Sequence, residues 1–169
     1  MPEVSGGREE VVNGEIRFTP NPPWNHARTA QNIYDLIRDQ VDKREVRVTS
    51  SAFDLVIRRH PLNTREPDLA VFDRSTIVKR DGRIHSAPQL IVEVVSPANT
   101  RREREEKLAD YASLGVPEVW YVDPSRIIEV FYLEDGELRR HAVVSEGELV
   151  PKEFPGVRVP VSEIWPPEG

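Results

Sequence analysis

The chain contains no cysteine among its 169 residues. This absence excludes disulfide bonds, thiolate zinc sites and a cysteine nucleophile. It also fits the reducing cytoplasm, which is the location we expect. The four histidines, at positions 26, 60, 85 and 141, show none of the close spacings that zinc ligands have. Cysteine chemistry and histidine-bound zinc are therefore not expected.

Long apolar runs are also missing. No stretch approaches the roughly 20 apolar residues that a membrane span needs, and the first ten residues, MPEVSGGREE, contain no signal-peptide core. We expect no membrane partner. A chain of this length can bury a core of its own. We predict a single domain over residues 1–169, with a flexible segment at 1–10 and a C-terminal extension at 154–169 that packs on the body.

Basic residues are fewer than acidic ones, 23 Lys and Arg against 29 Asp and Glu, so the net charge is −6. The charges are unevenly distributed: residues 28–107 hold 16 Lys and Arg against 13 Asp and Glu, a net of +3, and the remainder holds 7 against 16, a net of −9. An acidic protein with a more basic middle can still present a basic cleft to nucleic acid. The alternative is ordinary scatter of surface charge.

The hydrophobic pattern predicts alternating strands and helices. A helix is expected over 24–44, where apolar residues recur at helical spacing. A second helix should begin at Thr100, which forms a capping box with Glu103, and end at Gly115. Strands are expected at 15–19, 45–57, 67–73, 89–95, 119–122, 127–133 and 138–144. We predict an α/β fold with a mixed central β-sheet flanked by helices.

Glu93 lies inside the apolar run Leu-Ile-Val-Glu-Val-Val of residues 90–95. Such a β-branched run is typical of a central strand buried on both faces. A carboxylate buried there loses several kcal/mol of hydration unless a cation, a basic side chain or a proton compensates. Asp68 has a similar setting at the start of the preceding strand. Two acids on adjacent buried strands indicate a metal site.

Lys107 would join these acids. It lies about two turns into the second helix, which should return over the sheet and direct the lysine toward Glu93. Two carboxylates bind a hard cation such as Mg²⁺ through oxygen, and a lysine can bind a phosphate or position a nucleophile. These groups are what phosphodiester hydrolysis requires.

Each residue also has a simpler interpretation. Asp68 can be explained as a residue of a turn or a strand start. Glu93 can be explained as a protonated acid or as the partner of a core arginine. Lys107 can be explained as a solvated residue of a helix. Glu103 is explained by the capping box and His26 by packing. The metal-site hypothesis depends on the residues being placed together.

Several motifs resemble the Uma2 family, a family of proposed restriction endonucleases with the PD-(D/E)XK nuclease fold. They are Pro67-Asp68, the run 91–97, Glu106-Lys107-Leu108, Tyr111 and the segment 114–124, with a C-terminal match at 154–160 and weaker N-terminal matches at 12–15 and 22–26. The resemblance spans most of the chain. It implies a restriction-endonuclease-like α/β fold.

The resemblance also implies roles for individual residues. Asp68 and Glu93 would bind the metal, Mg²⁺ or Mn²⁺, and Lys107 would complete the catalytic set. The usual lysine of this fold, two residues after the second acid, is replaced by Val95. Accessory roles would fall to Glu15, His26 and Glu103. Nucleases of this fold often act as homodimers, which the sequence leaves open.

The first hypothesis is therefore a metal-dependent endonuclease that hydrolyses DNA. The alternative is a module on the same scaffold that binds nucleic acid or protein without turnover, which Val95 and the negative net charge favour. A third hypothesis is an enzyme that acts on another phosphoester. Fold alone does not decide between them.

Overall fold

The computed structural model describes residues 7–20, 23–50, 53–96 and 99–167. Its centre is a six-stranded sheet in the order β12-β11-β10-β9-β6-β3. β9 and β10 pair in parallel, and the other neighbouring strands are antiparallel. The sheet is therefore mixed, as predicted. Its strands are β3 (Val46–Ser50), β6 (Leu69–Asp73), β9 (Leu90–Val94), β10 (Glu118–Asp123), β11 (Ile127–Glu134) and β12 (Glu137–Val144).

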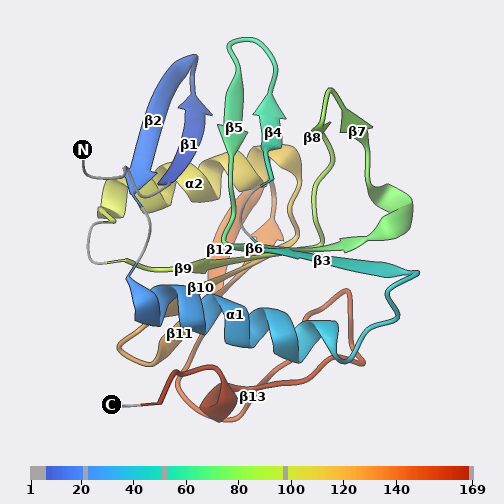
Figure 1. The fold of residues 1–169 in the computed structure, drawn as a ribbon, viewed down its shortest axis with the longest axis vertical. Coiled ribbons are helices and arrows are strands. Elements are labelled where there is room, and N and C mark those ends of the chain that lie inside the picture. The colour runs from blue at the N-terminus through green and yellow to red at the C-terminus, as the bar shows by residue number, and fades with distance from the viewer. Residues whose placement is uncertain (1–6, 21–22, 51–52, 97–98, 168–169) are drawn as a thin grey trace, which may run out of the picture.

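One long helix covers each face of this sheet: α1 (Trp24–Arg38) on one side and α2 (Arg101–Leu114) on the other (Figure 1). Successive side chains of a strand point to opposite faces. On β9, Leu90, Val92 and Val94 accordingly pack in the core on the α1 side, whereas Ile91 packs on the α2 side. Glu93 shares the face of Ile91 and is directed toward α2.

Short strands form arms on the α2 side of the sheet (Figure 1). β1 and β2 make an antiparallel hairpin, and β5-β4-β8-β7 form a four-stranded sheet. A further short pair, β13 with β14, lies near the C-terminal end of the chain. Two 3-10 turns complete the structure: η1 follows β6, and η2 follows β14. Their bounds are β1 (Gly7–Val12), β2 (Glu15–Pro20), β4 (Leu55–Arg58), β5 (Asn63–Arg65), β7 (Lys79–Arg80), β8 (Arg83–Ile84), β13 (Glu148–Leu149), β14 (Val159–Pro160), η1 (Arg74–Thr76) and η2 (Val161–Glu163).

Residues 7–10 of the segment that was expected to be flexible belong to β1, and residues 1–6 lie outside the described part, so the flexibility of 1–10 stays a prediction. The expected extent of the first helix was wrong. α1 ends at Arg38 rather than near 44. Val41 continues the apolar stripe, yet it packs against the core from a turn. Apolar spacing alone therefore overestimates the length of this helix.

The C-terminal segment contributes to the core on the α1 side. Val157, Val159, Val161 and Ile164 are buried there with Ile33 of α1. No helix in the described ranges is long and apolar enough to cross a membrane.

Candidate active site

Glu93 is the buried acid at the centre of the candidate site, with 3% of its surface exposed. The hydroxyl of Tyr111 donates a hydrogen bond to Glu93 Oε1, and Lys107 Nζ lies 3.7 Å from Oε2. Burial raises the pKa of the Glu93 carboxyl, while the Lys107 ammonium acts in the opposite direction. The negative charge of Asp68 adds to the increase. The two acids therefore interact electrostatically across the site.

α2 brings Lys107 and Tyr111 to this carboxylate. The helix begins with the predicted capping box, in which Glu103 N donates to Thr100 Oγ1 and Thr100 N donates to the Glu103 carboxylate. Lys107 and Tyr111 are four residues apart and therefore share one helix face. The charge of Glu93 is the main cause of a raised Lys107 pKa, so the lysine stays protonated.

Asp68 lies one residue before β6 and is 5% exposed. Its Oδ2 accepts a hydrogen bond from the backbone amide of Val94 at 2.8 Å. Its Oδ1 lies 2.7 Å from Nη2 of Arg8, on β1. Both oxygens of this carboxylate are therefore engaged.

His26 reaches the same place from the first turns of α1. Its Nε2 lies 2.6 Å from the carbonyl oxygen of Val94 and 3.6 Å from Asp68 Oδ2. Since a carbonyl can only accept, Nε2 carries the hydrogen. Burial lowers the pKa of His26, which favours the neutral ring. This histidine fixes the end of β9 and lies beside Asp68.

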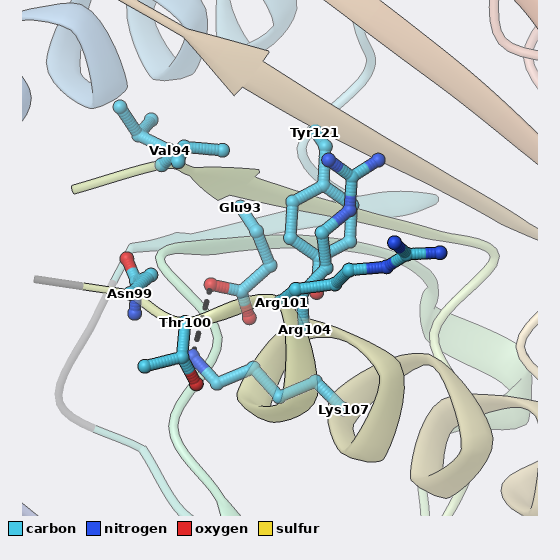
Figure 2. A pocket seen from close by; sticks show the side chains of 9 residues that line it. Glu93, Val94, Asn99, Thr100, Arg101, Arg104, Lys107 and Tyr121 are labelled. Atoms are coloured by element: carbon cyan, nitrogen blue, oxygen red, sulfur yellow. Dashed lines mark ion pairs between the residues drawn. The ribbon is translucent and has the colours of Figure 1, made fainter. Parts of the chain in front are cut away.

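A pocket with about 570 Å³ of empty space opens next to Glu93, between β9, β10 and the start of α2 (Figure 2). Lys107, Arg104 and Arg101 line it, so basic side chains outnumber its one acid, Glu93. Tyr121 lies beside Glu93 because the two residues are register partners on β10 and β9. The Tyr121 hydroxyl is buried and has no hydrogen-bond partner among the described residues. Such a lining suits an anionic group.

A second network connects the β1–β2 hairpin to α2. Arg65 of β5 lies 2.7 Å from Asp110 of α2 and 3.8 Å from Glu10 of β1. Glu10 also accepts a hydrogen bond from the Glu66 amide. Asn63 donates to Asp110 as well. These contacts fix β1, and hence Arg8, against the site.

The structure therefore brings Asp68, Glu93, Lys107 and His26 together and separates two other candidates from them. Glu103 is exposed and occupied by the capping box, and Glu15 is exposed on β2. Sequence reasoning missed Arg8 and did not assign Tyr111 to the site. Tyr111 could have been found, because it lies one turn after Lys107 on the same face. Arg8 gave no such signal.

The residues present fit a hard cation chemically. Two carboxylates and substrate oxygens are a typical ligand set for Mg²⁺. No group of three or more His, Asp or Glu side chains within the described ranges could hold a metal by itself. A bound ion would therefore depend on Asp68 and Glu93 and on water or substrate for its remaining ligands.

A mixed sheet between two helices, with a buried Asp and Glu and a half-buried Lys at one end, defines a protein of the restriction-endonuclease-like class. The chain belongs to the Uma2 family, described as "putative restriction endonuclease", whose family model matches residues 1–162. A solved structure of a putative nuclease belonging to DUF820, from Anabaena variabilis ATCC 29413, is similar with a TM-score of 0.76. It is 19% identical, and the match covers 94% of this chain and 89% of that one. No curated protein matches.

Proposed function

We propose that this protein is a metal-dependent endonuclease that hydrolyses phosphodiester bonds of DNA in the cytoplasm. The observation that carries the proposal is the ion pair of buried Glu93 and half-buried Lys107 at the wall of a pocket that three basic side chains line. Membership of a family of proposed restriction endonucleases supports it.

Asp68 and Glu93 would hold Mg²⁺ or Mn²⁺. When bound, such an ion stabilises charge on a phosphate oxygen and lowers the pKa of water. Lys107 stays protonated beside Glu93 and can bind a non-bridging phosphate oxygen. Tyr111 holds one oxygen of Glu93, which keeps the carboxylate in a single orientation. His26 holds the carbonyl of Val94 and thereby the strand end that carries Glu93.

Cleavage of plasmid and single-stranded DNA with Mg²⁺ or Mn²⁺ tests the proposal. We expect metal-dependent cleavage by the wild type and its loss in Glu93→Gln and Lys107→Met. Glu105→Gln is the matched control, because Glu105 is exposed on α2 and forms an ion pair with Arg101 at the surface. Cleavage retained in Glu93→Gln would reject this site, and cleavage of RNA instead of DNA would change the substrate.

The second candidate function is a module that binds nucleic acid without cleaving it. One observation favours it: Asp68 is already paired with Arg8, so the acid is neutralised without a metal. This candidate predicts DNA binding that weakens steeply with salt and no cleavage under any metal. Anisotropy of a labelled duplex, measured beside the cleavage assay, separates the two functions.

Simultaneous cleavage of both strands of a duplex would require two such sites. A homodimer would supply them, so we include it in the proposal. Light scattering with and without a duplex in the presence of Ca²⁺ is the test: a doubling of mass is expected on the duplex, and a monomer would restrict the enzyme to nicking.

A further inference from the structure

Asp68 forms an ion pair with the side chain of Arg8. Arg8 Nη2 lies 2.7 Å from Asp68 Oδ1, and Arg8 Nη1 donates to the Glu66 carbonyl at 3.0 Å. The guanidinium is thus held at two points, and the Arg8 side chain is only 19% exposed. These two contacts make Arg8 a fixed part of the candidate site.

β1 is itself well anchored where Arg8 leaves it. The backbone amide of Val11 donates to Thr64 Oγ1 at 3.0 Å, and Glu10 accepts from the Glu66 amide at 3.2 Å. Both partners belong to β5 or the residue after it. The β1–β2 hairpin lies beside β5 (Figure 1), and these contacts hold Arg8 in place against Asp68.

The charges of the site balance without a metal. Asp68 and Glu93 carry the negative charges, and Arg8 and Lys107 are the cations that face them. A divalent cation added to this balanced set would leave two uncompensated positive charges in a buried place, which is unfavourable. Of the two Asp68 oxygens, the guanidinium holds Oδ1 and the Val94 amide donates to Oδ2, so an ion that binds this carboxylate meets one of these two partners.

We propose that Arg8 and a divalent cation compete for Asp68, so that metal binding requires the Arg8–Asp68 ion pair to break. This inference rests on the metal use in the proposed function and adds a residue that determines metal affinity. Arg8 acts as the counter-ion of the metal-free site. Its removal should make metal binding tighter and the metal-free protein less stable.

Isothermal titration calorimetry with Mn²⁺, without nucleic acid, tests this competition. Because Arg8→Met removes a charged contact that the metal must otherwise break, we expect at least about tenfold tighter binding than in the wild type. The control is Arg17→Met. Arg17 lies on the same hairpin and pairs with Glu106 at 3.1 Å on the surface, so its removal should leave the affinity unchanged.

Thermal unfolding in EDTA and in Mn²⁺ gives a second readout. Arg8→Met should unfold at a lower temperature than the wild type in EDTA and gain more from Mn²⁺, since a ligand that binds the folded state more tightly stabilises it more. If Arg8→Met fails to fold in EDTA, Arg8→Lys serves instead. It keeps the positive charge but replaces the two-pronged guanidinium with a single ammonium group, and its affinity for Mn²⁺ should also exceed that of the wild type.

Equal Mn²⁺ affinity in the wild type and the Arg8 variants would overturn the competition and leave the nuclease proposal standing. Absence of Mn²⁺ binding in every variant would overturn both the competition and the metal dependence. Tighter binding by Arg8→Met in a protein that cleaves no DNA would support the competition and reject the nuclease.

Discussion

The hydroxyl of Tyr111 compensates for the buried charge of one carboxylate, that of Glu93. Tyr111 is fully buried on α2, and its hydrogen bond goes to Glu93 Oε1. Burial and the nearby charge of Glu93 raise the pKa of Tyr111 well above its ordinary value. Its hydroxyl therefore remains a donor over the whole working range of pH. Without it, one oxygen of Glu93 would be buried with no donor to compensate for lost hydration.

Tyr111→Phe removes this donor and leaves the ring in place. We expect the free energy of unfolding to fall by about 1–3 kcal/mol, because a buried acceptor loses its partner. Guanidinium-induced unfolding, monitored by circular dichroism, measures the change. Tyr132→Phe is the control, since its hydroxyl has no hydrogen bond within the described part of the chain and it lies only partly buried. Equal stability of both variants would show that the Tyr111 bond contributes nothing.

The sequence predicted some residues of this site and could not predict others. Glu93 was evident because burying a charge inside an apolar strand costs free energy unless a specific partner compensates for it. The position of Lys107 followed from the capping box, which fixed where its helix begins. Arg8 was not predictable, since its partner Asp68 lies 60 positions away and nothing in a polar N-terminal segment indicates a strand.

At the scale of elements, α2 is the component that assembles the site. Its first turn borders the pocket, its second provides Lys107 and its third provides Tyr111. Gly115 ends it in the left-handed conformation, with φ of 92°. The start of the helix therefore sets where the lysine lies.

Thr100→Ala removes the N-cap of α2. The loss should cost about 1 kcal/mol of unfolding free energy, because the Glu103 amide loses its side-chain acceptor. Chemical denaturation measures it. Ser113→Ala is the control near the other end of the helix, where the Ser113 hydroxyl only donates to the Asp110 carbonyl. A larger effect of the serine change would contradict the importance of the capping box.

β5 illustrates why polar strands escape sequence analysis. Residues 58–66 suggest a loop, yet Asn63, Thr64 and Arg65 form a buried strand. Their polar groups bond to β1 and to Asp110 of α2. A strand stabilised by partners distant in sequence shows no apolar alternation. By contrast, β9 and β10 consist of apolar runs and were recognisable.

At the scale of the whole molecule, Glu66 connects the arms to the central sheet. It lies between β5 and β6, its carbonyl accepts from Arg8 of β1, and its amide donates to Glu10. Its carboxyl group interacts electrostatically with that of Asp54, just before β4. Burial raises the pKa of Glu66 from its ordinary 4.5 to about 7, and the charge of Asp54 adds to this, whereas Arg8 opposes it. The folded protein therefore binds this proton more tightly than the unfolded chain.

This difference predicts how stability depends on pH. A folded state that binds a proton more tightly loses stability as pH rises from the unfolded pKa to the folded one, here from about 4.5 to about 7. Glu66→Gln keeps a hydrogen-bonding group next to Asp54 and removes the titration, so the loss should be smaller in the variant. Unfolding free energies of both proteins across this range measure the difference. Glu105→Gln, exposed on α2, should follow the wild type. Parallel curves for Glu66→Gln and the wild type would mean that the junction of the arms and the sheet holds no such proton.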